Sequence, residues 1–242
     1  MQPNGYLELL AWLGIGGAHP GGLALTKAIL HPLKINSHTR VIDIGCGTGQ
    51  TAAYLQKTFQ CQVTALDRNA LMLEKAKERF RKEKLDIELI EGDAECLPLS
   101  NDEFDLILAE SVTIFTDLKK SIPEYARILR PGGVLVDVEL TAITPFEEEG
   151  EFHTFYQIRK VPTEKEWRQS FREADFRSVQ VTREGSVATA LNSTIQHLDE
   201  IPDLNPSTPL DPSHFQLSLL HSMLMDQYSS QLKYCVFQMK KE

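Results

Sequence analysis

Short apolar runs alternate with amphipathic helical patterns along the first 140 residues. The alternation predicts strands over RVIDIG (40–45), CQVTALD (61–67), DIELIEGD (86–93), FDLILAES (104–111) and VLVDVEL (134–140). Helical periodicity is found between them, over 49–58, over 69–81 and in a segment that ends at residue 129. Strands that alternate with helices predict a parallel sheet with helices on both faces.

Residue pairs of the capping-box type mark two helix starts. Ser121 and Glu124 predict the start of the helix that ends at residue 129, with Pro123 in its first turn. Thr163 and Glu166 predict a helix that runs through Glu173. RPGG (130–133) predicts a turn that leads into the strand at 134–140.

The rhythm changes on either side of this core. Before it, 4–13 and 22–31 are expected to form two short helices around GIGGAHPGG. After it, we expect an irregular stretch over 141–162, a strand over 176–184, helices over 186–199 and 213–228 around a proline-rich loop at 201–212, and a closing strand over 232–239. The detour between the last two strands predicts a cap or insertion near the site.

Composition narrows the class of protein. The 242 residues carry a formal net charge of −9, which disfavours binding to nucleic acid. The four cysteines are scattered and form no CxxC pair, so neither a disulfide framework nor a metal site is expected, and a reducing cytoplasmic location is the simplest interpretation. The first apolar run, LLAWLGIGGA, is short and interrupted by glycines, so we expect neither a signal peptide nor a membrane span.

A glycine-rich turn follows the first strand of the core, in VIDIGCGTGQ (41–50). Such a turn before a helix offers free backbone N–H groups to a ligand. Gly45, Gly47 and Gly49 give G-x-G-x-G, whereas the dinucleotide fingerprint is G-x-G-x-x-G. Asp67 ends the next strand, where a carboxylate can accept hydrogen bonds from ribose hydroxyls. That acid would serve NAD equally well, so the loop and Asp67 alone leave the cofactor open.

Four stretches in this order carry a family resemblance: VIDIGCGTG, ALD, EGDAECLPLSNDEFDLILAESV and ILRPGGVLVDVEL. Together they resemble class I S-adenosylmethionine-dependent methyltransferases, in the small-molecule branch of ubiquinone/menaquinone- and sterol-type enzymes. The resemblance implies a Rossmann-like, doubly wound, seven-stranded α/β sheet, mostly parallel with an antiparallel last strand. We expect a single domain with a helical lid (1–37), a cofactor-binding core (38–140) and a substrate-side half (141–242) that carries an insertion at about 185–230.

The resemblance also implies a set of cofactor-binding residues. Those in the glycine loop face the amino-acid part of S-adenosylmethionine, Asp67 binds the ribose, and the stretch after the third strand binds the adenine. Glu110 and Ser111 lie where the sulfonium meets the methyl acceptor. The expected cofactor set is Asp43, Gly45, Cys46, Gly47, Gly49, Asp67, Arg68, Met72, Asp93, Ala94, Glu95 and Glu110.

The acceptor side is less defined. His19, between glycines, is the candidate base, Glu110 is the other candidate catalytic residue, and no metal is expected. The sequence AESV lacks the Asn/Asp-Pro-Pro-Tyr/Phe motif of amine-methylating DNA and protein enzymes, which leaves O-, N-, C- or S-methylation of a small molecule, by a monomer or a homodimer. The alternatives are a non-catalytic S-adenosylmethionine-binding protein and an NAD-dependent oxidoreductase. Further candidates for the pocket lining are His153, Tyr156, Arg159, His197 and His221.

Overall fold

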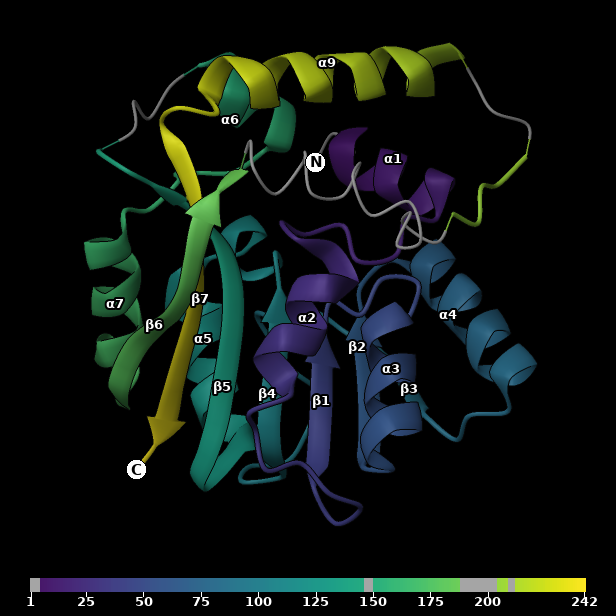
Figure 1. Cartoon of the computed structure of the whole chain (residues 1–242), viewed down its shortest axis with the longest axis vertical. Coiled ribbons are helices and arrows are strands. Elements are labelled where there is room, and N and C mark those ends of the chain that lie inside the picture. Colours follow the sequence, from purple (N-terminus) through teal and green to yellow (C-terminus); the bar gives the residue numbers. More distant parts are fainter. Residues whose placement is uncertain (1–4, 146–149, 188–203, 209–211) are drawn as a thin grey trace.

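A seven-stranded sheet forms the centre of the chain in the computed structural model, which describes residues 5–145, 150–187, 204–208 and 212–242 (Figure 1). The strand order is β3-β2-β1-β4-β5-β7-β6, and β7 runs antiparallel to β5 and β6 on its two sides, whereas the other neighbouring strands are parallel. The predicted sheet is therefore confirmed. The strands are β1 (Arg40–Ile44), β2 (Gln62–Asp67), β3 (Glu88–Glu91), β4 (Phe104–Glu110), β5 (Leu129–Ala142), β6 (Phe176–Ser186) and β7 (Leu232–Lys241).

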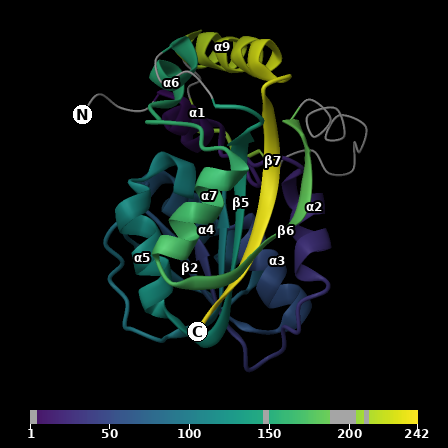
Figure 2. The same cartoon turned by 90° about the vertical axis from the view of Figure 1, so that its left-hand side faces the viewer.

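Helices cover both faces of this sheet and the carboxyl end of its parallel strands. In β1, Val41 contributes to one core and Ile42 to the other, as the twofold alternation of a strand requires. Helices α2, α3 and α4 pack on the first face and α5 and α7 on the second, whereas α1, α6 and α9 lie across the carboxyl end (Figures 1 and 2). The helices are α1 (Gly5–Leu13), α2 (Gly22–Leu30), α3 (Gln50–Phe59), α4 (Ala70–Glu83), α5 (Leu118–Ile128), α6 (Glu151–Tyr156), α7 (Glu164–Glu173) and α9 (Pro212–Tyr228), with a 3-10 turn, η1 (Thr113–Phe115).

Most predicted elements form within a few residues of their expected bounds. Thr163 and Glu166 form the predicted capping box of α7, and the buried Trp167 that follows donates from Nε1 to the carbonyl of Leu140 at 3.1 Å. Gly49 and Asn69 stand at the N-caps of α3 and α4. No helix in the described part of the chain combines the length and the apolar character needed to cross a bilayer.

The capping box predicted at Ser121 was wrong. Helix α5 starts one turn earlier, at Leu118, because the side chain of Asp117 caps it by accepting from the backbone N–H of Lys119. The carboxylate of Glu124 is used elsewhere, since it accepts from the N–H of Leu97 at 2.7 Å and pairs with Arg127. Pro123 accordingly lies inside the helix and not in its first turn.

Two further expectations need correction. The stretch 141–162 is not wholly irregular, because it contains α6, whose Phe152 and Tyr156 are buried. RPGG (130–133) does not precede β5 but forms an irregularity inside it, where the pairing with β4 shifts between Phe104 and Leu106. Residues 188–199 of the helix expected at 186–199 lie outside the described residues, as does the candidate His197.

Candidate functional site

A cavity of about 400 Å³ lies at the carboxyl ends of β1, β2 and β4, where α1 and the segment after it cross the sheet. This is the edge at which open α/β sheets bind ligands. Leu7 and Leu10 of α1 and Phe115 of η1 add apolar walls. The predicted site residues that line the cavity are His19, Asp43, Gly45, Cys46, Gly47, Asp67, Arg68, Met72, Asp93, Ala94, Glu110 and Ser111.

The three loop glycines all have a positive φ, which only glycine adopts without strain. Two of them, Gly45 and Gly49, differ in the side chains that they approach. A Cβ on Gly45 would lie 2.2 Å from Cγ2 of Val112, so glycine at this position lets the loop pass close to Val112, the residue before η1. A Cβ on Gly49 would lie 2.6 Å from the ring of Phe80, and Gly49 is absent from the described cavity lining. The third glycine therefore allows α3 and α4 to pack closely and does not face the ligand space.

Asp67 is held by backbone donors. Its Oδ2 accepts from the N–H of Gly47 at 2.9 Å and its Oδ1 from the N–H of Asn69 at 2.8 Å. Burial raises the pKa of this carboxyl, although those hydrogen bonds and Arg68 counteract the shift. The hydrogen bond to Gly47 joins the end of β2 to the glycine loop, so the two predicted motifs form one rigid surface.

Asp43 is a buried acid facing the same cavity. It is 2% exposed, and its Oδ2 is a buried oxygen without a hydrogen-bond partner among the described residues. Burial, reinforced by the nearby charges of Glu110 and Asp67, raises the pKa of Asp43 well above its usual value. An unsatisfied carboxylate at the centre of an acidic cavity favours a cationic ligand with N–H donors. The ammonium and sulfonium groups of S-adenosylmethionine fit that requirement.

Glu110 and His19, the two candidate catalytic residues, are brought together although they are far apart in sequence. His19 Nε2 lies 3.5 Å from Glu110 Oε1, and both side chains are nearly buried. Thr26 Oγ1 lies between them, 2.7 Å from Glu110 Oε1 and 3.2 Å from His19 Nε2. Thr51 donates to the other carboxylate oxygen at 2.8 Å. Sequence reasoning missed both threonines, because Thr26 lies on a helix that no motif covers and Thr51 is one residue past the quoted loop.

Three of the other acceptor-side candidates, His153, Tyr156 and His221, lie on α6 and α9 across the carboxyl end and are not part of the described cavity lining. The Tyr156 hydroxyl lies 2.7 Å from Nδ1 of His221 on α9, and the Tyr6 ring stacks on His221 with centroids 4.9 Å apart. Burial lowers the pKa of His221 to about 4, so this histidine is neutral at physiological pH. His153, next to these residues on α6, is also buried.

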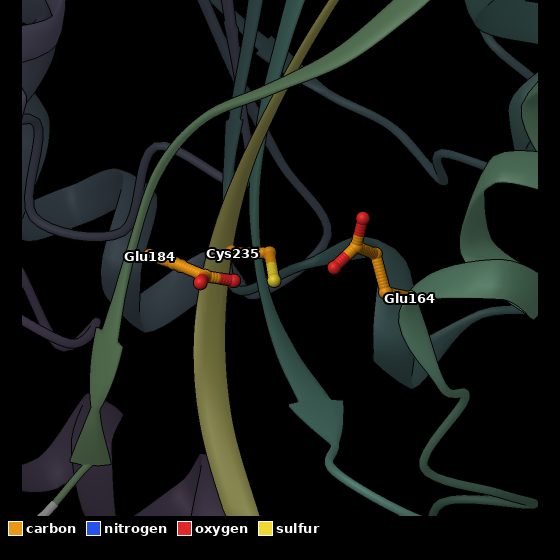
Figure 3. Close-up of side chains that lie close together, drawn as sticks. All are labelled: Glu164, Glu184 and Cys235. Carbon is orange, nitrogen blue, oxygen red and sulfur yellow. The ribbon is translucent and has the colours of Figure 1, made fainter.

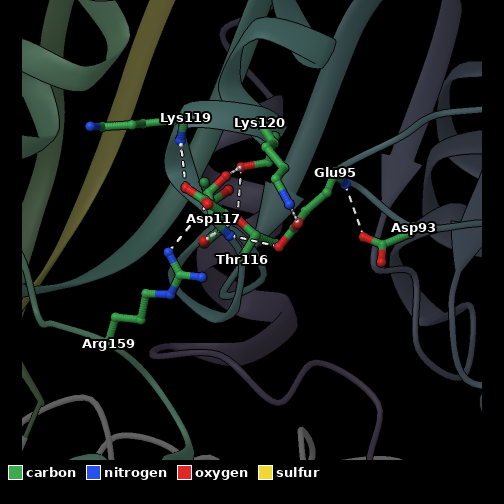
Figure 4. Close-up of polar contacts among 9 residues, drawn as sticks. Asp93, Glu95, Thr116, Asp117, Lys119, Lys120 and Arg159 are labelled. Atoms are coloured by element: carbon green, nitrogen blue, oxygen red, sulfur yellow. Dashed lines mark hydrogen bonds and ion pairs between the residues drawn. The ribbon is translucent and has the colours of Figure 1, made fainter. Parts of the chain in front are cut away.

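Glu95 lies to one side of the cavity and is not among its described lining residues. Its carboxylate accepts from the N–H of Asp117 at 2.8 Å and from Lys120 at 3.1 Å (Figure 4). Arg159 also joins this network, because its Nη1 donates to Oδ2 of Asp117 at 3.2 Å. Glu95 thus anchors the start of α5 instead of facing the ligand space.

One group of potential metal ligands lies away from this site, in the part of the chain that the structure describes. Glu164, Glu184 and Cys235 bring ligand atoms within 4.8 Å of one another (Figure 3). The ammonium of Lys233 hydrogen-bonds to both carboxylates, at 3.0 and 2.5 Å. The Lys233 ammonium therefore already pairs with both carboxylates. The cluster is explained as an ion-pair network that links α7 to β6 and β7 at the edge of the sheet.

Comparison with known proteins places this site in a family. Residues 41–133 match the family described as a methyltransferase domain. The uncharacterized methyltransferase YodH of Bacillus subtilis is 35% identical over 234 residues, which cover 96% of this chain and 97% of that protein. The 2-methyl-6-phytyl-1,4-hydroquinone methyltransferase 2 of Oryza sativa is 34% identical over 173 residues, 67% of this chain and 44% of that protein.

A similar fold occurs in a solved structure. The phosphoethanolamine N-methyltransferase 2 of Haemonchus contortus, solved with S-adenosylhomocysteine, superposes with a TM-score of 0.76 at 20% identity, over 97% of this chain and 56% of that one. The motif order, the acidic cavity and these matches agree, and they decide against the NAD-dependent alternative. The chain belongs to the methyltransferase family, in the S-adenosylmethionine-dependent class that the sequence motifs predicted.

Proposed function

We propose that the cavity beneath α1 binds S-adenosylmethionine and that the methyl group passes to a small-molecule acceptor at its Glu110–Ser111 end. The observation that carries this proposal is the buried Oδ2 of Asp43, which has no hydrogen-bond partner among the described residues, in a cavity also lined by Asp67 and Glu110. A pyrophosphate would be repelled by this set of acids, whereas a ligand with ammonium and sulfonium charges is attracted.

Different residues of the cavity would contact different parts of the cofactor. Asp43 would receive the ammonium group and the Gly45–Gly47 backbone the carboxylate of the amino-acid part. Asp67 would accept from the ribose hydroxyls. Asp93 and Ala94 would meet the adenine, the first with a side-chain acceptor and the second with a backbone N–H. Gly49 and Glu95 are left out of this set for the packing reasons given above.

The bound cofactor supplies the electrophilic methyl group and the leaving group. The protein's tasks are then to align the acceptor with that methyl group and to exclude water. Helix α1 covers the cavity with Leu7 and Leu10, which supports a role for residues 1–37 as a lid. A base is needed only if the acceptor loses a proton as it attacks.

His19 has the hydrogen-bond geometry of such a base. Its Nδ1 lies 3.2 Å from the carbonyl of Pro20, which can only accept, so Nδ1 carries a hydrogen. The one hydrogen of the Thr26 hydroxyl is donated to Glu110 Oε1, so Nε2 of the neutral ring keeps its lone pair. A proton taken up at Nε2 creates an imidazolium 3.5 Å from the Glu110 carboxylate, and Nε2–H can then donate to Thr26 Oγ1. Glu110 thus positions His19 through Thr26.

Cofactor binding and turnover are tested separately. Thermal shift and calorimetry with S-adenosylhomocysteine, with NAD as the control ligand, are expected to give stabilisation and saturable binding with the former only. A methyl-labelled donor incubated with metabolite pools is then expected to yield one labelled product. Stabilisation by NAD alone would contradict the assignment. Binding without any labelled product would favour the non-catalytic S-adenosylmethionine-binding protein.

The acceptor and the location of the protein stay proposals. The family branch supports a small organic acceptor methylated on O, N, C or S, and the hydroquinone named in the rice relative is one such class. The four thiols are free, which supports a cytoplasmic location. The His19→Ala variant should lower turnover of the identified acceptor without changing the affinity for S-adenosylhomocysteine.

A further inference from the structure

A second cavity of about 400 Å³ lies beyond η1, between the start of α5, the segment after α6 and helix α7. Its floor is apolar, with Leu118, Pro162 and the buried Trp167 among the lining residues. Its rim is polar and charged. An apolar floor with a charged rim is suited to an organic ion, because the body and the charged head of such a ligand need different surroundings.

Cations predominate on this rim. Lys119, Arg159 and Lys160 line the cavity, against the acids Asp117 and Glu173. In a chain with a net charge of −9, a lining in which cations outnumber acids differs from the general surface. The cavity also lies at the N-terminal end of α5, whose dipole adds positive potential.

Two of the three cations have donors to spare. Among the described residues, Arg159 makes one polar contact, from Nη1 to Oδ2 of Asp117 at 3.2 Å, and its side chain is 79% exposed. A guanidinium carries five N–H donors, so most remain available to a ligand. The ammonium of Lys119 has no hydrogen-bond or ion-pair partner in the described residues, and the side chain extends away from the Asp117 network (Figure 4). Lys160 is already paired with Glu166.

The second cavity and the cofactor cavity share one lining residue, Thr116, whose hydroxyl is fixed by the carbonyl of Thr113 and by Ser121, each at 2.7 Å. A ligand whose reacting atom lies near Ser111 would have to pass Thr116 to reach Lys119 and Arg159. The acidic cofactor cavity would repel the same anionic head, which fixes the direction in which the ligand lies.

We propose that this second cavity is an anion-binding subsite for the methyl acceptor, in which Lys119 and Arg159 hold a carboxylate or phosphate group attached to an apolar body. The proposal rests on the proposed function for the identity of the ligand as methyl acceptor. It makes Lys119 and Arg159 specificity-determining residues that do not touch the methyl donor.

Direct binding tests the subsite without turnover. Hexanoate and hexyl phosphate are titrated into the protein saturated with S-adenosylhomocysteine and into the protein without it, with neutral hexanol as the third probe, and binding is followed by ligand-observed NMR. Hexanoate, hexyl phosphate or both should bind saturably and hexanol should not. The tighter of the two anions identifies the head group as carboxylate or phosphate.

The double variant Lys119→Gln/Arg159→Gln should weaken the preferred anion about tenfold or more, the loss expected for charge-assisted hydrogen bonds. Both side chains are exposed, so the fold and the affinity for S-adenosylhomocysteine should not change. Lys82→Gln is the matched control, since Lys82 is an exposed cation paired with Glu78 on α4. It should bind the anion as the wild type does.

Three results would overturn the subsite: no saturable anion binding, equal binding of hexanol, or equal weakening in the control variant. If S-adenosylhomocysteine fails to bind while the anion binds as expected, the proposed function is wrong and the anion site stands. If the cofactor product binds and the anion does not, only the subsite is wrong.

Discussion

The two halves of the carboxyl edge are built in different ways. On the cofactor side, Asp43, Gly45 and Asp67 all lie at or directly after the ends of neighbouring parallel strands, and Asp67 hydrogen-bonds the glycine loop itself. On the acceptor side, α1 and η1 line the cavity, whereas α6 and α9 lie across the carboxyl end of the sheet (Figure 1). These elements are widely separated in sequence and meet through aromatic contacts such as Tyr6 with His221.

This difference determines which half can be identified from sequence. Strand ends fix the positions of a few short motifs, and the order of these motifs carries the family resemblance that implies the cofactor. The acceptor half depends on tertiary contacts, in which the same aromatic and apolar residues would suit many ligands. Substitutions on the cofactor side should therefore change the affinity for S-adenosylhomocysteine. Those on the acceptor side should change how well α1 is ordered over the cavity and which acceptor is bound.

The largest effect is expected from Gly45→Ala on the cofactor side. The new Cβ would lie 2.2 Å from Cγ2 of Val112, at a φ of 71°, so the loop or η1 has to move. We expect a loss of stability of about 2 kcal/mol or more and loss of measurable S-adenosylhomocysteine binding. Urea denaturation and calorimetry measure the two quantities.

Gly132→Ala is the matched control for that variant. Gly132 also has a positive φ, of 77°, but a Cβ there meets no atom within 4 Å. The Gly132→Ala substitution should lower the free energy of unfolding only by the backbone strain, about 1–2 kcal/mol. It should leave the affinity for S-adenosylhomocysteine unchanged. Equal effects of the two variants on affinity would show that the close approach of Gly45 to Val112 is unimportant.

Asp67→Ala should have the next largest effect. Removal of a charged acceptor for the ribose hydroxyls should weaken S-adenosylhomocysteine binding by about 1.5–3 kcal/mol, or roughly tenfold to a hundredfold. Asp67→Asn keeps one carbonyl oxygen and should recover part of the loss. Asp86→Ala, an exposed acid after α4, should bind as the wild type does. Calorimetry that finds unchanged affinity in Asp67→Ala would remove this residue from the ribose site.

The elements that sequence reasoning missed share a physical cause. The motif Ser121-x-x-Glu124 satisfied a local rule, but Asp117 offered a competing cap and Arg127 and Leu97 took the Glu124 carboxylate. Thr26 reaches Glu110 across 84 positions, a contact that no local pattern encodes. Gly49 matched the motif, yet its conformation serves packing against Phe80 on the next helix. Local rules predicted the sheet and the strand-end acids, and tertiary competition decided the rest.

A smaller effect is expected where the two halves are joined. The buried ammonium of Lys75 on α4 donates to the carbonyl of Trp12 at 3.0 Å and to that of Asn205 at 2.5 Å. Lys75→Met would leave these carbonyls with one donor fewer, which costs about 1–3 kcal/mol locally. Hydrogen exchange of residues 5–13 should become faster, with a few-fold loss in S-adenosylhomocysteine affinity.

The control for Lys75 is Lys82→Met on the exposed side of the same helix. Its exchange over residues 5–13 should match that of the wild type. If Lys75→Met shows the same protection as this control, α1 is held over the cavity by its aromatic contacts and not by the Lys75 bridge. The acceptor half would then be independent of α4.

The smallest effect on the cofactor site is expected from the buried acids of β5. Asp137 accepts from Thr113 at 2.9 Å, and Glu139 accepts from the N–H groups of Val112 and Thr113, so the pair holds η1 in place. Burial raises the pKa of Asp137 to about 7, and burial together with the charge of Asp137 raises the pKa of Glu139.

The sign of the resulting pH dependence follows from these raised values. Between the ordinary carboxyl pKa and about 7 the folded protein binds more protons than the unfolded chain, so stability falls as the pH rises through this window. For Asp137 the loss from about pH 6 to pH 8 should be about 1 kcal/mol.

Asp137→Asn keeps an acceptor for Thr113 and removes the titrating group. Its free energy of unfolding, compared with that of the wild type at both pH values, should lack this loss, while its affinity for S-adenosylhomocysteine stays unchanged because neither acid lines the cofactor cavity. An unchanged pH dependence would mean that Glu139 alone titrates in this window and that Asp137 stays ionised beside it.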